Sequence, residues 1–284
     1  MKLLRYKITP TSSFVSFPKG DMLFGQFASM LFLKGDDTLK NYLTTEPKII
    51  FSDFLPRGYV MKPTLPLSFF GVNDSVKKEF RKKQFISLEN LQKGKLQECE
   101  EVTLTQVKTA IRNAINRKTF STDDSGVFSP YGIEEINFLK EPTLYVLYDE
   151  DSFSSQKLTS LLQEMGRLGF GKKSSIGKGQ FRVELDESFK RFENISSSYY
   201  LTLSPTLLNG QKNIEKVYYE IFNRFGKHSN SNNAFKKPLL MVQSGAVVKL
   251  KKRQEYIGKS INNGYKEISF VQGYSIVIPF EMEG

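Results

Sequence analysis

The chain has 284 residues, of which 39% are hydrophobic, and its 41 lysines and arginines against 30 aspartates and glutamates give a formal net charge of +11. This length and composition predict two domains with a substantial core, and the basic excess predicts an anionic partner, either nucleic acid or membrane. With Cys99 the only cysteine and His228 the only histidine, disulfides and a thiolate metal cluster are excluded, and zinc chemistry and a Ser-His-Asp triad are disfavoured.

The N-terminal segment indicates where in the cell the protein is expected. Arg5 and Lys7 interrupt its apolar stretch, so it lacks the apolar core of a signal peptide. No run in the chain approaches the roughly 18 apolar residues of a membrane-spanning helix. We therefore expect a cytoplasmic protein with no membrane partner.

The first half is predicted to alternate strands and helices. Residues 2–9 alternate apolar and polar side chains, which predicts a strand. Asp21 is expected to cap a helix whose apolar stripe carries Phe24 and Phe27 into the core. Further strands are predicted at 48–54, 143–148 and 180–185, and a second helix at 155–168 behind a Ser154 or Ser155 cap.

A long, irregular, lysine-rich insertion is expected at about 55–142. It holds a basic helix candidate at 76–83, whose charged face is either solvated or in contact with an RNA backbone. A better helix is predicted at 104–116 from its apolar spacing. The side chains expected to face inward from that helix are Leu104, Val107, Ile111 and Ile115.

The most informative segment, residues 169–179, lies between the helix 155–168 and the strand 180–185. It contains four glycines and three lysines and no acidic residue. Glycine permits positive φ and a close approach of backbone amides to a ligand, and lysine and serine side chains beside such amides suit phosphate groups. The order helix, loop, strand excludes a nucleotide-binding P-loop and a dinucleotide fingerprint, which both run from strand to helix. The alternative is a surface loop with solvated lysines.

Without the insertion, the first half has the order β-α-β-β-α-β, which is the ferredoxin-like or RRM arrangement. Its first and last strands are neighbours, so the loop after the first strand can converge with the glycine loop. The predicted fold class is α+β, with an N-terminal ferredoxin-like domain at 1–190 and a smaller C-terminal domain at 196–284. The second domain is expected to contain a helix over 214–225 and strands at 199–203, 238–243, 246–250 and 274–280.

Two segments contain residue types that could be catalytic or bind a metal, but each has a simpler structural explanation. The acidic run 149–151 precedes a capped helix and is expected to form an exposed turn rather than a metal site. His228 lies in the polar stretch 226–233 and is expected to be solvated rather than catalytic. We expect no metal, no cofactor and no catalytic residue.

Several motifs, in one order along the chain, resemble the RAMP superfamily. They are Lys19-Gly-Asp-Met-Leu-Phe-Gly-Gln-Phe27, Ser52-Asp-Phe-Leu-Pro56 followed by Lys62-Pro63, Arg112-Asn-Ala-Ile-Asn-Arg117, Gly169–Gly179, and Gly245 beside the strand 246–250. The glycine loop is typical of RAMP proteins broadly. The pairing of Gly-Asp-x-Leu-Phe-Gly with Ser-Asp-x-x-Pro resembles the subunit that caps the crRNA 5′ handle in type III-A CRISPR (Csm) effector complexes. One departure is Asn116, where the family pattern has an acidic residue.

The resemblance implies two ferredoxin-like domains and a sequence-specific grip on the repeat-derived 5′ handle of the crRNA. It also implies contacts to the large polymerase-like subunit and to the terminal RAMP backbone subunit, which hold the catalytic activities of such complexes, so this chain is expected not to be an enzyme. The expected RNA-binding residues are Lys19, Gly20, Asp21, Arg112, Asn113, Arg117, Lys172, Lys173, Ser174, Ser175, Gly177, Lys178 and Gly179. The amides of the last two glycines are expected to approach phosphates.

The second domain is the expected docking surface for the large subunit. Tyr218, Tyr219 and Phe222 are aromatic anchors of the kind that interfaces favour, and Tyr219 is expected to be the exposed one. The alternative is that the other two fill the core of that domain. Two other functions stay open: a RAMP-type endoribonuclease that processes precursor crRNA by general acid–base catalysis, and the equivalent subunit of a type III-B or type I complex.

Overall fold

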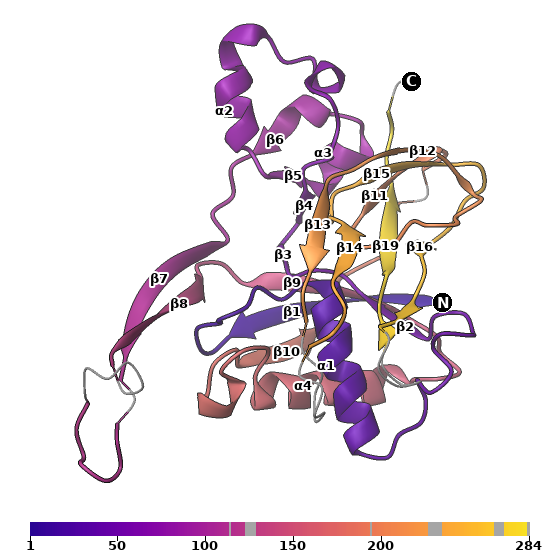
Figure 1. Ribbon diagram of the computed structural model, residues 1–284. Helices are drawn as coiled ribbons and strands as arrows, with labels where there is room; N and C mark the ends of the chain where they lie inside the picture. Colours follow the sequence, from indigo (N-terminus) through magenta and orange to yellow (C-terminus); the bar gives the residue numbers. More distant parts are fainter. Residues whose placement is uncertain (114, 123–128, 194, 227–234, 264–269, 283–284) are drawn as a thin grey trace.

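The architecture is taken from a computed structural model, which describes residues 1–113, 115–122, 129–193, 195–226, 235–263 and 270–282 (Figure 1). His228, expected in a polar loop, lies outside the described residues. Mixed helices and antiparallel sheets make up the fold. Within the described ranges, no helix combines the length and the apolar character needed to cross a membrane.

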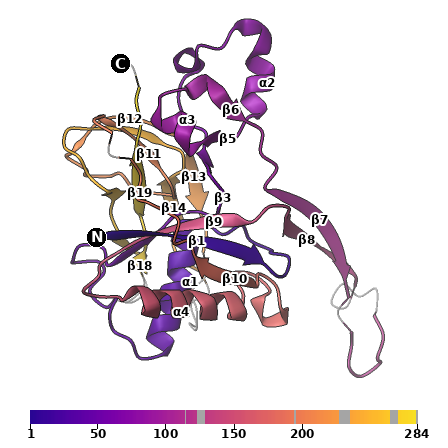
Figure 2. The same cartoon turned by 180° about the vertical axis from the view of Figure 1, so that it is seen from behind.

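A central antiparallel sheet organises the first half. Its strands are β1 (Lys2–Pro10), β2 (Ile49–Phe51), β9 (Pro142–Tyr148) and β10 (Phe181–Leu185), in the order β10-β1-β9-β2, with the short β3 (Leu55–Pro56) also paired to β9. The helices α1 (Gly20–Leu33) and α4 (Ser155–Leu168) lie together on one face of it (Figures 1 and 2). These strands and helices confirm the elements predicted for this half, and Phe24 and Phe27 are fully buried as expected.

The two helices begin differently. Ser154 caps α4 as expected, because its hydroxyl accepts a hydrogen bond from the Lys157 amide. The predicted Asp21 cap is wrong: Lys19 precedes α1, and Asp21 lies inside the first turn, buried against another part of the chain. The acidic run 149–151 forms the expected turn before α4, with its last two residues exposed.

The insertion comprises two parts. One is a small unit at the top of Figure 1, built from the sheet β4-β5-β6 (Tyr59–Met61, Phe85–Ser87 and Cys99–Glu100) and the helices α2 (Lys77–Lys82) and α3 (Leu88–Gln92). Its 3-10 turns are Leu67–Phe70, Asp74–Val76 and Leu96–Glu98. The helix α2 confirms the basic helix predicted at 76–83.

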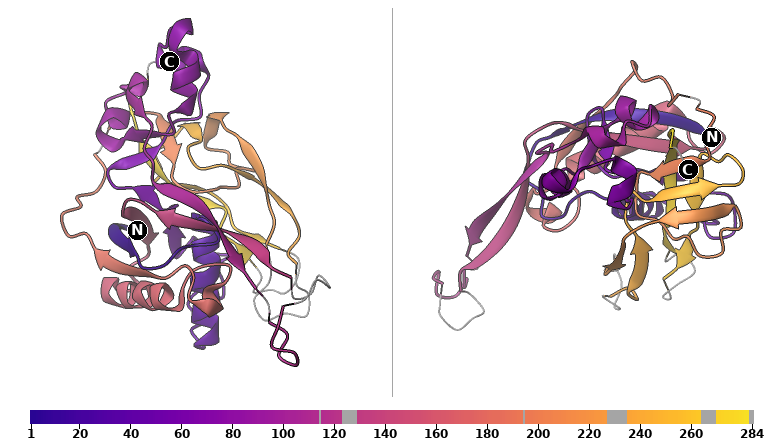
Figure 3. Two further views of the ribbon diagram at one scale, coloured as in Figure 1. Left: turned by 90° about the vertical axis from the view of Figure 1, so that its left-hand side faces the viewer. Right: turned by 90° about the horizontal axis from the view of Figure 1, so that it is seen from above.

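The other part is a long hairpin, β7 (Thr105–Arg112) and β8 (Tyr131–Phe138), here called the arm, which projects from the body (Figure 3). The helix predicted at 104–116 is therefore wrong. Of the four residues expected to face inward only Leu104 is buried, whereas Val107 and Ile111 are 57% and 76% exposed. The i, i+4 spacing of these two fits a helix, but it also fits one face of a strand, and β-branched residues favour the strand.

The second half is built of strands. Its five-stranded sheet has the order β12-β15-β11-β19-β16, formed by Ile214–Tyr218, Val247–Leu250, Tyr199–Thr202, Tyr274–Pro279 and Tyr256–Gly258. Two hairpins accompany it, β13–β14 (Ile221–Arg224 and Leu239–Val242) and β17–β18 (Ile261–Asn262 and Phe270–Val271). The helix predicted over 214–225 is wrong, because β12 and β13 occupy that segment.

The two halves share one apolar core. The face of the central sheet opposite the helices carries Ile50, Tyr145 and Leu147, and these pack in one cluster with Leu201 and Ile276 from the second sheet. All five side chains are almost completely buried. Neither sheet therefore covers its inner face without the other.

Candidate nucleic-acid interface

The glycine loop (residues 169–179) meets the loop that follows β1, as expected from the adjacency of β1 and β10. The Gly179 amide donates to the Ser13 carbonyl at 2.8 Å, and the Gln180 amide donates to the Ser12 hydroxyl at 2.8 Å. The four glycines have φ between 74° and 85°, and Lys173 also lies in the left-handed region. The loop thus has a defined conformation that needs glycine.

Gly179 is held by close contacts within the protein. Its amide is used by Ser13, and a Cβ at this position would lie 2.2 Å from the Phe170 carbonyl oxygen. The Gly177 amide is also engaged, donating to the Ser174 carbonyl at 2.9 Å, although a Cβ there would meet open space. These two amides therefore already have acceptors within the protein.

The amides available for an anion lie earlier in the loop. Within the described part of the chain, the backbone N–H groups of residues 172–175 donate to no protein acceptor. Lys172, Lys173 and Ser175 are exposed around them, and Ser174 is half-buried. Consecutive free amides beside lysine side chains are groups that can bind an anion.

Glu135 of the arm brings an acidic group to a loop that has none in its own sequence. Its carboxylate accepts hydrogen bonds from Lys178 Nζ at 2.7 Å and the Ser13 hydroxyl at 2.6 Å, and pairs with Arg112 at 2.9 Å. The bond from Lys178, with those from Ser13 and Arg112, lowers the pKa of Glu135 to about 2. Arg112 therefore joins the glycine loop as expected, although it does so from a strand.

The arm touches the loop at a second point and then leaves it. The Lys173 ammonium lies 5.5 Å from the centre of the Tyr131 ring, within the range of a cation–π contact. Asn113 and Arg117 follow the end of β7 and are exposed. Among the described residues, neither makes a hydrogen bond or an ion pair with the glycine loop.

Lys19, Gly20 and Asp21 belong to a different cluster, at the boundary with the second half. The Gly20 amide donates to Asp53 Oδ1 at 2.8 Å, and Asp21 pairs with Arg224 at 2.7 Å. The Lys19 ammonium lies 4.7 Å from the ring centre of Phe222. The buried Asp21 carboxylate thus supports the fold at this boundary.

Asp53 is the buried centre of that second cluster. Its other oxygen accepts a hydrogen bond from the Ser244 hydroxyl at 2.7 Å. Burial raises the pKa of Asp53 to about 6, against the opposing effect of Lys19. Burial also raises the pKa of Asp21, despite its ion pair with Arg224.

Sequence reasoning missed the partners of both clusters. Asp53 stands inside the quoted Ser-Asp-x-x-Pro motif, which marked the residue without giving its contacts. Glu135, Ser13, Arg224 and Ser244 carried no local signal, because each meets its partner from a distant segment. Only the fold brings these groups together.

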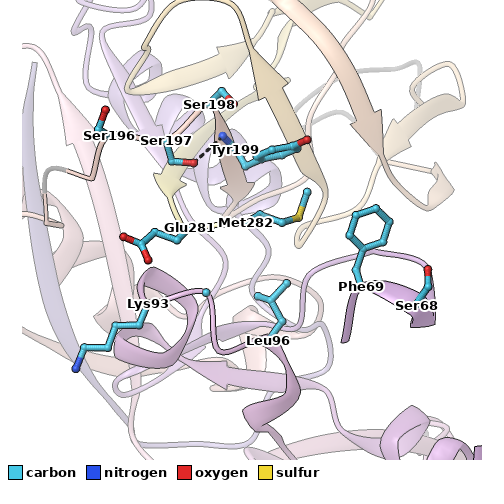
Figure 4. A pocket seen from close by; sticks show the side chains of 11 residues that line it. Ser68, Phe69, Lys93, Leu96, Ser196, Ser197, Ser198, Tyr199, Glu281 and Met282 are labelled. Carbon is cyan, nitrogen blue, oxygen red and sulfur yellow. Dashed lines mark hydrogen bonds between the residues drawn. The ribbon is translucent and has the colours of Figure 1, made fainter. Parts of the chain in front are cut away.

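A polar groove lies away from both clusters, between the insertion and the second sheet (Figure 4). It encloses about 860 Å³ and is lined by residues that include Lys93, Ser196–Ser198, Tyr199 and Glu281. None of the residues predicted to bind RNA lines it. We therefore do not place the nucleic-acid interface there.

No protein-family model and no curated protein matches the sequence. Solved structures do match over almost the whole chain. The Csm3-Csm4 subcomplex of the type III-A CRISPR-Cas interference complex matches with 18% identity, 98% of this chain and 99% of that chain covered, and a TM-score of 0.63. Csm1-Csm4 cassettes with pppApA and with AMPPNP match with 16% identity and TM-scores of 0.64 and 0.65, covering 99% of this chain and 98% and 99% of theirs.

Csm4 is the component that these structures share. At such low sequence identity the agreement shows a common fold, and it extends from end to end of both chains. It agrees with the resemblance drawn from the motifs. It leaves the individual site residues to be argued from their own geometry.

Proposed function

We propose that the chain is a non-catalytic RNA-binding subunit of a type III-A CRISPR interference complex and that it holds the repeat-derived 5′ handle of a crRNA. The observation that carries this is the glycine loop: exposed Lys172 and Lys173 surround free backbone amides, in a chain with the Csm4 fold. Single-stranded RNA offers phosphates, 2′-hydroxyls and unstacked bases to such a loop. Such a complex would work in the cytoplasm, where we expect this protein to lie.

The fold is proposed to consist of two ferredoxin-like domains, 1–190 with its insertion at about 55–142, and 196–284. The first is supported by the strand order β10-β1-β9-β2, in which the last strand lies beside the first and the third lies between the first and second. The second, strand-built in its described residues, is proposed as a degenerate version of the same unit.

The proposed partners are a large polymerase-like subunit and a terminal RAMP backbone subunit, by analogy with the Csm1-Csm4 and Csm3-Csm4 structures. Tyr219 supports a docking surface on the second half, because it is 50% exposed as expected, although it follows a strand and not a helix. We expect this chain and the large subunit encoded beside it to co-elute in size-exclusion chromatography without RNA. Separate elution at micromolar concentration, with co-elution only after RNA is added, would assign their association to the RNA.

RNA binding is tested with fluorescently labelled handle RNA taken from the repeats beside the gene, and with a scrambled RNA of equal length. Replacing Lys172 and Lys173 by alanine is expected to weaken binding of the handle about tenfold and to reduce the slope of log K against log salt by roughly 1.4, at about 0.7 for each lost phosphate contact. The matched control replaces Lys251 and Lys252, an adjacent exposed pair on the second half. If both double variants weaken binding equally, the loop lysines contribute only through the overall charge of the protein and not through a specific site.

The same assay addresses the other functions. The proposal assigns no catalytic residue, so the handle RNA and a full repeat are expected to stay intact during incubation without metal. Site-specific cleavage would instead indicate an endoribonuclease that processes precursor crRNA. A gene neighbourhood encoding type III-B or type I subunits would change the complex and its partners while leaving the RNA site in place.

A further inference from the structure

The Glu135 carboxylate occupies a site with the donors of a phosphate site. Three groups from three segments converge on it: Lys178 Nζ at 2.7 Å, the Ser13 hydroxyl at 2.6 Å and an Arg112 nitrogen at 2.9 Å. Lys178 and Arg112 together carry two positive charges, and the Glu135 carboxylate neutralises only one of them. Guanidinium, ammonium and hydroxyl groups together are the usual donors to a phosphate.

One donor at this site has no acceptor. Within the described residues, Arg112 Nε is buried and makes no hydrogen bond. A buried donor without a partner is costly, and native structures rarely retain one without a reason. Glu135 engages a terminal nitrogen of Arg112 and leaves Nε unused, whereas the two non-bridging oxygens of a phosphodiester can make a bidentate contact with Nε and a terminal nitrogen together.

The site is also continuous with the proposed RNA surface. Lys178 ends the stretch whose free amides and exposed lysines begin at Lys172, and Lys173 lies over Tyr131 of the arm. A strand of RNA on those amides would therefore have its next phosphate within reach of this cluster.

We propose that Arg112, Lys178 and Ser13 form a phosphate-binding site for the RNA backbone, and that Glu135 occupies it as an intramolecular stand-in until RNA displaces its carboxylate. This inference rests on the proposed function. The exchange needs only side-chain rotation, because the strand beside Glu135 is held by two backbone hydrogen bonds between Ile136 and Phe14, of 2.7 and 2.8 Å. Without RNA the Glu135 carboxylate offsets one of the two positive charges, and weakly bound anions must compete with this tethered group.

The test compares three variants of the full-length chain in their affinity for the labelled handle RNA. Glu135→Gln is expected to bind about tenfold more tightly than the wild type, the equivalent of about one charge-assisted hydrogen bond. Glu135→Asp keeps the charge but withdraws the carboxylate from its three donors, and is expected to tighten binding by a smaller factor. Glu134→Gln, an exposed neighbour on β8, changes the net charge equally and is expected to alter affinity by less than about twofold.

The outcomes separate this inference from the proposed function. If wild-type binding depends on Lys172 and Lys173 while both Glu135 variants bind no more tightly than the wild type, the stand-in is refuted and the RNA-binding function is retained. If Glu135→Gln and Glu134→Gln tighten binding equally, the effect is general charge and the stand-in is again refuted. If the wild type does not prefer the handle RNA to the scrambled RNA, both fail. Should Glu135→Gln not fold, the charge-conserving Glu135→Asp decides by the same criterion.

Discussion

Asp53 should make the stability of this protein fall between mildly acidic and neutral pH. Its carboxyl is fully enclosed between the Gly20 amide and the Ser244 hydroxyl, and burial raises its pKa from 3.8 to about 6. Between these values the native state holds a proton that the unfolded chain has released, so raising the pH favours unfolding. Each pH unit between the two pKa values is worth about 1.4 kcal/mol, which gives on the order of 3 kcal/mol in total. About 2 kcal/mol of this should be lost between pH 4.5 and 7.5.

The measurement is the free energy of unfolding in urea across that interval, for the wild type and Asp53→Asn, both carrying His228→Asn so that no imidazole titrates. The decline of the asparagine variant should be smaller than that of the wild type by about 2 kcal/mol, and what is left of it belongs to Asp21, whose pKa is also raised by burial and which is present in both proteins. The pKa values of Glu135, Asp36, Asp149 and Asp186 are lowered, so those groups titrate mainly below the interval. Parallel curves for the two proteins would mean that Asp53 is ionised throughout, and would refute the reasoning.

Four further substitutions test local packing and capping, each by urea denaturation at pH 7.5. Gly179→Ala should lower the free energy of unfolding by several kcal/mol, because its Cβ would lie 2.2 Å from a backbone oxygen. Gly177→Ala, in open space at φ 83°, should lower it by only about 1 kcal/mol. Equal losses would contradict the difference in contacts. Arg224→Met should cost about 3 kcal/mol by leaving Asp21 buried without its partner, and a cost below about 1 kcal/mol would mean that the pair is dispensable. Ser154→Ala should lower the free energy of unfolding by about 1 kcal/mol, because α4 loses its cap. An unchanged free energy of unfolding would mean that the cap does not stabilise the fold.

The elements predicted correctly from the sequence are those whose own pattern is satisfied by the core. The alternation of residues 2–9 becomes β1, with Tyr6 and Ile8 buried, and the stripe of 155–168 becomes α4 behind the Ser154 cap. In both, the apolar face read from the sequence is the face that packs on the central sheet. Local propensity and burial agree, which is the condition under which pattern reading works.

The helix predicted at 104–116 was wrong because the apolar residues of β7 stay outside the core. Val107 and Ile111 are exposed, so a rule that turns apolar spacing into a buried helical face does not apply to them. Thr105 and Thr109 complete an alternation of β-branched residues, the signal that favoured a strand. The helix predicted at 214–225 was wrong for a related reason, because Tyr219 and Glu220 interrupt the apparent apolar stripe between β12 and β13.

The candidate site likewise has one part that is encoded by neighbouring residues and another that depends on contacts between distant segments. The loop 169–179 was recognisable because its glycines, lysines and serines are contiguous. The Glu135 contact with Lys178 spans 43 residues, the Asp53 contact with Ser244 spans 191, and no spacing rule reaches across either. The acceptor of the Gly179 amide could not be predicted for the same reason, because it is on the loop after β1.

The geometry of the loops proposed to bind RNA thus depends on segments outside the first sheet. Glu135 of the arm ties Lys178 and Ser13 together, while Ser244 and Arg224 of the second half hold Asp53 and Asp21, which fix the start of α1. The shared core formed by residues such as Tyr145 and Leu201 joins the two halves rigidly enough to maintain both sets of contacts. If the chain bridges RNA and neighbouring subunits as proposed, a shift at a docking surface on the second half would reach the start of α1 through Arg224 and Ser244.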